Sequence, residues 1–240
     1  MKATISPFSV LPLDNPIWNA LSTEQAYLAQ GTPMAMRFPK DLAPFAAMPN
    51  QSAAAYRALE QTLAGEVAAL FLDTLPILPP DWSMVHSGEM YQMLFDAPLL
   101  PEPDHPVRKL SQPDIPEILA LTKLTEPGPF LSRTIELGDY YGIFESGSLA
   151  AMAGERLHLT GYTEVSAVCT HPDFRGRGYS HALMATVMRG ILNRGETPFL
   201  HVRKENPAVH LYRKLGFQVR AELHLAVVQY VSSPPSYNQQ

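Results

Sequence analysis

Two arginines and two glycines alternate in the segment from Arg175 to Ser180, which reads Arg-Gly-Arg-Gly-Tyr-Ser. Because a glycine has no Cβ, Gly176 and Gly178 allow the backbone to turn tightly and to point successive amides at one anion. An amphipathic stretch follows at once, so these amides would lie at the positive end of a helix. The pattern predicts a phosphate-binding loop, with a surface turn and two solvated arginines as the structural alternative.

This loop does not match two common nucleotide-binding motifs. Position 181 is His181 rather than a third glycine, so the dinucleotide motif Gly-x-Gly-x-x-Gly is absent. The Gly-Lys-Ser/Thr ending of a phosphate loop is absent as well. Neither nucleotide-binding class is therefore assigned.

The single cysteine, Cys169, precludes an internal disulfide and a thiolate metal site. Together with His171 it could act as a nucleophile and its base, because residues at i and i+2 of a strand face the same side. No third group orients such a pair, so we expect a buried structural cysteine. Other histidines lack metal-ligand companions and are expected to be satisfied or solvated: His201, His210 and His224.

The loop is expected to lie between a strand and a helix. The helix runs to Asn193, since Leu183, Val187 and Ile191 recur at i, i+4 and i+8 on one face. Other runs of strand and helix character surround these two elements. The expected strands span 140–145, 148–159, 162–170, 198–204 and 217–230, and the expected helices span 111–125, 130–137 and 207–215, the last capped by Asn206.

Four prolines between Asp96 and Pro106 predict a domain boundary, since proline continues neither a helix nor a central strand. We therefore predict an N-terminal domain over residues 1–105 and a second domain over 106–240. The first contains 4 basic and 11 acidic residues and the second 14 and 12, so the two segments differ in character. Within the first we expect helices at 15–31 and 53–64 and strands at 66–72, 82–86 and 90–95.

The segment from Arg175 to Ser180 resembles the signature of the GNAT superfamily of acyl-CoA-dependent N-acetyltransferases, Arg/Gln-x-x-Gly-x-Gly/Ala. Only Ser180 departs from the signature, and a serine keeps the backbone amide and is nearly as small. The stretch from Asn206 to Phe217 resembles the closing motif of the family, in which an asparagine, a tyrosine and Leu-Gly-Phe recur. The resemblance covers about residues 107–230.

This resemblance implies an α/β fold of the α+β type. Its sheet is mixed and mostly antiparallel, splays at the acetyl-CoA site and is flanked by helices. Residues 1–105 would form a smaller α+β domain. One interpretation of that domain is a degenerate half-copy of the GNAT fold, although no internal repeat of the motifs is visible.

The same resemblance implies direct transfer of an acetyl group from acetyl-CoA, as co-substrate and without a metal, to a primary amine in a ternary complex. It assigns Glu164 as general base, by its position eleven residues before Arg175, and Tyr212 as general acid beside the CoA sulfur. It also implies a set of cofactor-binding residues: Val168, Cys169, Thr170, Arg175, Gly176, Arg177, Gly178, Tyr179, Ser180 and Asn206.

Both catalytic assignments have structural alternatives. Glu164 is an ordinary carboxylate at a strand end in one interpretation, whereas burial near Tyr162 and Val165 would raise its pKa toward the range of a base. Tyr212 stands between Leu211 and Leu215, where a tyrosine often only packs. A phenol has a pKa of about 10, so it can donate a proton at neutral pH.

The acceptor is open among small amines, amino acids and peptide N-termini. By analogy with the fold, residues 124–132 and 157–162 would choose it. Glu126 could attract a cationic amine, although an exposed loop charge is the favoured interpretation. A second class of function, an acetyl-CoA-binding sensor or interaction module without turnover, needs the phosphate-binding loop but not Glu164 and Tyr212.

Charge and composition exclude other classes. A chain of net charge −5 offers no broad basic face for nucleic acid. No export signal or membrane span is visible, so a reducing cytoplasm without membrane partners is expected. A homodimer stays open.

Overall fold

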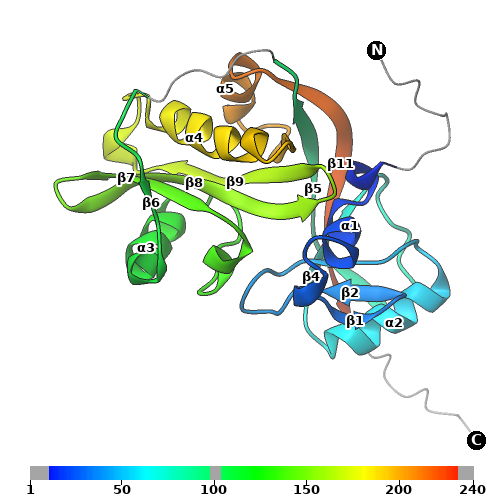
Figure 1. The fold of residues 1–240 in the computed structure, drawn as a ribbon. Coiled ribbons are helices and arrows are strands. Elements are labelled where there is room, and N and C mark those ends of the chain that lie inside the picture. The colour runs from blue at the N-terminus through cyan, green and yellow to red at the C-terminus, as the bar shows by residue number, and fades with distance from the viewer. Residues whose placement is uncertain (1–10, 98–103, 232–240) are drawn as a thin grey trace, which may run out of the picture.

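The computed structural model describes residues 11–97 and 104–231. Residues 98–103, in the middle of the predicted domain boundary, lie outside the described residues. The described residues form an eight-stranded sheet with helices on both faces and a small three-stranded sheet beside it (Figure 1).

The strand order of the large sheet is β4-β11-β5-β10-β9-β8-β7-β6. Neighbouring strands are antiparallel except for β9 and β10, which are parallel. The mixed, mostly antiparallel sheet predicted from the sequence is therefore confirmed. The strands span Ala68–Leu72 (β4), Trp82–Phe95 (β5), Arg108–Lys109 (β6), Tyr140–Glu145 (β7), Ser148–Leu159 (β8), Tyr162–Thr170 (β9), Thr197–Arg203 (β10) and Phe217–Tyr230 (β11).

Helices cover the two faces of this sheet with separate cores. α4 (Tyr179–Asn193) and α5 (Ala208–Lys214) lie on one face, and α3 (Ile115–Thr125) lies on the other (Figure 1). The predicted apolar stripe of α4 faces the core, because the side chains of Leu183, Val187 and Ile191 are all 0% exposed. Burial of this stripe fixes the N-terminus of α4 at the edge of β9.

The N-terminal segment packs on the α3 side of the sheet, around β4 and β11 (Figure 1). Ser52 caps α2 as predicted, since its hydroxyl accepts a hydrogen bond from the amide of Ala55 at 3.3 Å. The elements of this segment are α1 (Pro16–Ser22), β1 (Gln30–Thr32), β2 (Ala35–Arg37), β3 (Ala46–Ala47) and α2 (Ala53–Leu63).

The large sheet crosses the predicted boundary at residues 105 and 106. β4 and β5 come from before the boundary, and β5 lies between β11 and β10 in the middle of the sheet. The division into two domains stays a prediction, but the sheet does not follow it.

Three predicted elements are wrong. β5 is one continuous strand through Gly88, because β11 pairs with it along its length. The first helix ends at Ser22, well before Gly31. In place of a helix over residues 130–137 there is only a short 3-10 turn, Thr134–Leu137, where the Thr134 hydroxyl accepts from the amide of Leu131 and donates to the carbonyl of Leu42. These tertiary contacts override the local helix signal.

Candidate active site

A cleft opens where β9 and β10 separate. The two strands pair only over three residues each, Tyr162–Glu164 with Thr197–Phe199. Beyond that point lies a cavity of about 1140 Å³, lined by the C-terminal ends of both strands, the loop before α4, and α5. All the predicted cofactor-binding residues line this cavity: Val168, Cys169, Thr170, Arg175, Gly176, Arg177, Gly178, Tyr179, Ser180 and Asn206.

The predicted phosphate-binding loop adopts the backbone that its glycines allow. Gly176 and Gly178 have φ angles of 78° and 84°, in the left-handed region that disfavours other residues. A Cβ on Gly176 would meet open space, so the positive φ, not crowding, requires glycine there. The Ser180 hydroxyl lies 3.0 Å from the Thr170 hydroxyl and ties the helix start to β9. The amides and arginines of this loop suit the phosphates of a CoA-type ligand.

β9 carries a bulge beside the cleft. Ser166 pairs with Gly154 and Cys169 with Met152, so β9 has one extra residue in this stretch. Ala167 adopts a φ of 53°, which is uncommon for a residue with a side chain. Such a bulge redirects the strand and leaves backbone groups unpaired next to the cavity.

Cys169 has the buried environment predicted for a structural cysteine. Its side chain is 7% exposed and packs in the core under α3. Burial raises the pKa of the thiol to about 11. The thiol therefore stays protonated at neutral pH, which is unfavourable for a nucleophile.

Tyr212 and Asn206 lie at the α5 end of the cleft. Tyr212 is 8% exposed, and burial raises the pKa of its phenol to about 12, so the phenol keeps its proton at neutral pH. The side-chain oxygen of Asn206 accepts a hydrogen bond from the amide of Ala208 at 2.9 Å. Asn206 therefore binds the first amide of α5, but the N-cap position is Pro207, so the predicted cap lies one residue before it.

Glu164 has no exposed surface and does not line the cleft. Its carboxylate accepts two hydrogen bonds from Arg156, at 2.8 Å from Nε and 2.6 Å from Nη2, and lies 2.7 Å from Nδ1 of His201. Burial alone would raise the pKa of Glu164, but Arg156 and then His201 lower it to about 2. The expectation of a raised pKa is therefore wrong, and a carboxylate of such low pKa is a weak base. The base role stays a prediction that this geometry disfavours.

A row of polar side chains, buried at Glu164, His201 and Gln92, continues across the sheet. His201 lies 3.2 Å from the amide nitrogen of Gln92, and the oxygen of Gln92 accepts from Arg220 at 2.7 Å. Arg220 also pairs with Asp14. The row links the cleft wall, formed by Arg156 and His201, to the N-terminal segment.

Sequence reasoning missed Arg156 and His201 as members of the site. The available signal is a charged residue within a buried strand, since Arg156 is the only arginine or lysine between Ser148 and Leu159. A buried polar residue needs a partner, and a partner on another strand is invisible to spacing along the chain.

The part of the cleft that the sequence assigns to the acceptor differs from the prediction in one respect. Thr125 to Pro129 line it, as expected for residues 124–132, and Glu126 is among them. The hairpin over residues 157–162 does not, because Leu157 and Leu159 are buried against the N-terminal segment. That segment and its partner strand form the apolar wall instead: Phe45, Phe71, Met90, Leu225 and Val227.

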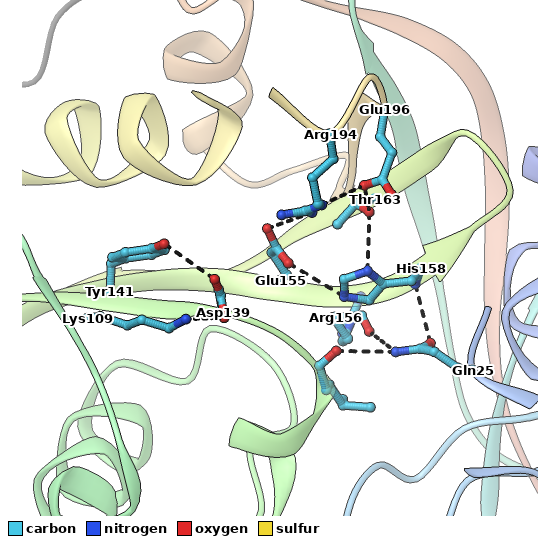
Figure 2. Close-up of polar contacts among 11 residues, drawn as sticks. Gln25, Lys109, Asp139, Tyr141, Glu155, Arg156, His158, Thr163, Arg194 and Glu196 are labelled. Atoms are coloured by element: carbon cyan, nitrogen blue, oxygen red, sulfur yellow. Dashed lines mark hydrogen bonds and ion pairs between the residues drawn. The ribbon is translucent and has the colours of Figure 1, made fainter. Parts of the chain in front are cut away.

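A second polar cluster, outside the cleft, holds β8 in place (Figure 2). β8 has two residues, Arg156 and Leu157, opposite Glu164 of β9, since Glu155 pairs with Val165 and His158 with Thr163. Gln25 bonds both sides of this irregularity: its amide donates to the Arg156 carbonyl at 2.8 Å, and its oxygen accepts from the His158 amide at 3.3 Å (Figure 2). The N-terminal segment therefore fixes the backbone of Arg156.

The described residues contain no group of three or more His, Cys, Asp or Glu side chains that could hold a metal ion. None of their helices is long and apolar enough to span a membrane.

Comparisons with known proteins agree with this geometry. A family model described as FR47-like protein matches residues 140–225. A structure from Novosphingobium aromaticivorans, described as an acetyltransferase of the GNAT family, is 35% identical with a TM-score of 0.86, and the match covers 93% of this chain and 100% of that chain. The GCN5-related N-acetyltransferase from Kribbella flavida is 16% identical with a TM-score of 0.62, over 90% and 96% of the chains, and shows the fold alone. No curated protein matches the chain.

The sheet that splays between β9 and β10, with a glycine loop at its opening, has the fold of the GNAT acetyltransferases. The chain belongs to the GNAT family, because the match at 35% identity extends over almost its whole length. Family and fold together support acyl transfer in general terms.

Proposed function

We propose that the protein is an N-acetyltransferase that moves an acetyl group from acetyl-CoA to a primary amine by direct transfer in a ternary complex. One observation carries the proposal: the glycine loop at the start of α4, the separated ends of β9 and β10, and the phenol of Tyr212 share a single cleft. When bound, acetyl-CoA supplies the thioester carbonyl that the amine attacks and the thiolate that leaves.

The loop and the adjacent strand would hold this co-substrate. The amides around Gly176 and Gly178, with Arg175 and Arg177, suit its phosphates. Backbone groups of Val168, Cys169 and Thr170 suit the peptide-like pantetheine arm, which extends a sheet where two strands separate. Asn206 is a further contact in this proposal.

The transfer then has three requirements: polarisation of the thioester carbonyl, a proton for the leaving thiolate, and removal of a proton from the amine. The bulge at Ala167 offers backbone N–H groups that can polarise a carbonyl oxygen. Tyr212 donates the proton that the leaving thiolate takes up. The amine loses its proton to water in the cleft, since Glu164 would first have to leave both Arg156 and His201. In this scheme Glu164 is a positioning residue.

The test combines binding and turnover. Acetyl-CoA binding is measured by calorimetry, and release of the CoA thiol is followed with a panel of amines, amino acids and short peptides. Arg177→Gln should weaken acetyl-CoA binding about tenfold or more, because a charge-assisted bond to phosphate is lost. Arg57→Gln, on the exposed face of α2 and away from the cleft, is the matched control.

The outcomes separate the two classes of function. Binding with acceptor-dependent release supports the enzyme. Binding without release from any acceptor supports the acetyl-CoA sensor instead. Absence of binding contradicts both, because both depend on the loop from Arg175 to Ser180.

A further inference from the structure

A buried hydroxyl without a hydrogen-bond partner and a partly exposed guanidinium lie beside the cleft. The phenol oxygen of Tyr140 is buried without a hydrogen-bond partner, and the residue is 1% exposed. Arg156 uses Nε and Nη2 for Glu164, and its Nη1 makes no hydrogen bond to another described residue. Leaving a buried hydroxyl unpaired is costly, so the Tyr140 hydroxyl beside a guanidinium that lines the cleft indicates a missing polar ligand.

Both donors line a small recess next to the acceptor end of the cleft. The recess has a volume of about 10 Å³, enough for about one water-sized group. Arg156, Ser166 and Ala167 line both the recess and the cleft, as do residues 127–129. The recess therefore lies beside the β9 bulge, where the acetyl group is proposed to lie.

The ring of Tyr140 is fixed by its neighbours. A Cβ at Gly154 would overlap ring atoms of Tyr140, so the glycine leaves the space that the ring fills. Phe130 packs edge-on against the same ring with centroids 5.3 Å apart. Burial raises the pKa of Tyr140, so its hydroxyl keeps the proton and acts as a donor.

The guanidinium of Arg156 is fixed as well. Its Cζ lies 4.8 Å from the ring centroid of Phe45. Glu164 holds one of its edges, and Gln25 holds its backbone carbonyl. The remaining edge is thus oriented before any ligand binds, which lowers the entropy cost of binding.

A carboxylate at the mouth of the recess, with one oxygen in the water-sized space, is the ligand that this pair of donors complements. It has two oxygens with free lone pairs and can accept one bond from a phenol and a charge-assisted bond from a guanidinium. The nearby wall of the cleft is apolar and aromatic, with Phe45, Phe71 and Met90, and suits an uncharged side chain.

We propose that the acceptor is an apolar or aromatic amino acid, or another amine with a carboxylate near its nitrogen, and that Tyr140 and Arg156 bind this carboxylate. The proposal rests on the proposed function, because it names the acceptor of the same cleft. Tyr140 and Arg156 then determine specificity.

The first test measures binding without turnover. Calorimetry compares N-acetylphenylalanine with its carboxamide, and N-acetylleucine with its carboxamide, each with and without CoA. The carboxylates should bind about tenfold or more tightly than the carboxamides. Tyr140→Phe should reduce this ratio severalfold. The control is Tyr56→Phe, which also removes a buried unpartnered hydroxyl, but in a core away from the cleft, and should keep the ratio.

Equal binding of acid and carboxamide overturns the proposal, as does binding of neither or a ratio unchanged by Tyr140→Phe.

The second test compares kcat/KM for phenylalanine, phenylalanine amide and phenethylamine. Preference for the amino acid supports the proposal. Equal or better turnover of the two neutral-ended amines overturns it while the acetyltransferase function stands. Absence of acetyl-CoA binding refutes the proposed function. The carboxylate site is then still tested by comparing the binding of acid and carboxamide in the absence of CoA.

Discussion

Glu164 and Tyr212 are both buried, yet their surroundings stabilise opposite states: an ionised carboxylate and a protonated phenol. Tyr212 has an apolar environment and faces the cleft, so it keeps its proton. Glu164 lies between Arg156 and His201, so it keeps its charge. The identity of the neighbours, more than burial itself, decides the protonation state of each group.

Tyr212→Phe should lower kcat about a hundredfold, since the leaving thiolate loses its proton donor. Acetyl-CoA affinity should change little, because the phenol contacts only the reacting end in the proposed complex. Single-turnover measurement of thiol release separates the chemical step from product release. A chemical step as fast as that of the unmodified protein would transfer the acid role to solvent.

Glu164→Gln should destabilise the fold in a pH-dependent way. The pKa of Glu164 is about 2 in the folded chain against an ordinary value of 4.5. The ionised carboxylate therefore stabilises the fold above pH 4.5, and the contribution is lost as the pH falls toward 2. The shift corresponds to about 3 kcal/mol at neutral pH.

Urea unfolding at a series of pH values tests this expectation. The difference in the free energy of unfolding between the parent protein and Glu164→Gln should shrink as the pH falls below 4.5. The exposed Glu117→Gln variant on α3 is the control and should differ little at any pH. A difference for Glu164→Gln that is constant with pH would contradict the assigned pKa.

At this scale the sequence identifies the residues that act through backbone or through a local motif. The glycine loop and Asn206 are recognisable because residues that are close in the sequence form these features by themselves. The partners of Glu164 are not, since Arg156 and His201 come from two different strands. A pKa that depends on such partners cannot be predicted from neighbours in sequence.

At the scale of elements, irregularities in two strands orient the side chains of the site. The bulge at Ala167 turns β9 toward the cleft, and the irregularity after Glu155 in β8 orients Arg156. Gly154, between them on the sheet, pairs with Tyr140 of β7 and makes room for its ring.

Gly154→Ala should lower the free energy of unfolding by about 1–3 kcal/mol, because the added methyl group overlaps the ring of Tyr140. The matched control is Gly190→Ala in α4. There the nearest atom to the new Cβ is Nη1 of Arg194 at 3.8 Å, so a gain of up to about 1 kcal/mol is expected from helix propensity. Chemical denaturation of both variants provides the measurement. Equal stability of the two would refute the packing argument.

Element boundaries were predictable wherever turns are encoded locally. The limits of β7, β8 and β9 agree with the expected ranges, since Ser146-Gly147 and Gly161 mark the turns between them. β5 was expected as two strands because its centre, Ser87-Gly88-Glu89, has weak strand propensity. Pairing with β11 on one side supplies the order that the local sequence lacks.

The whole molecule depends on both sides of the proline-rich stretch. β5 separates β11 from β10, and Gln25 and Gln92 bond Arg156 and His201, which follow the proline-rich stretch. A chain that begins at residue 106 should therefore not reach a folded state, because its sheet would lack a central strand. Circular dichroism and size-exclusion chromatography test this, and co-expression of residues 1–105 as a separate chain should restore folding. A folded, acetyl-CoA-binding fragment 106–240 would refute the expectation.

The sequence was least informative at this scale. Composition and prolines divide the chain into two segments, but composition does not report which strands pair. Pairing of β5 with β10 and β11 joins residues far apart in the chain, and such contacts leave no local pattern.

The central position of β5 also determines how early this strand can fold during translation. On the ribosome, Phe95 is made about 120 residues before the first residue of β11. At ~5–20 residues per second, this strand waits on the order of ten seconds for its partners. For most of that interval, until β10 is made, a 14-residue strand containing Trp82, Met90 and Phe95 lacks both neighbours of the finished sheet. Slower translation would prolong this exposure, so the yield of native protein should depend on translation speed and on chaperones that cover nascent chains.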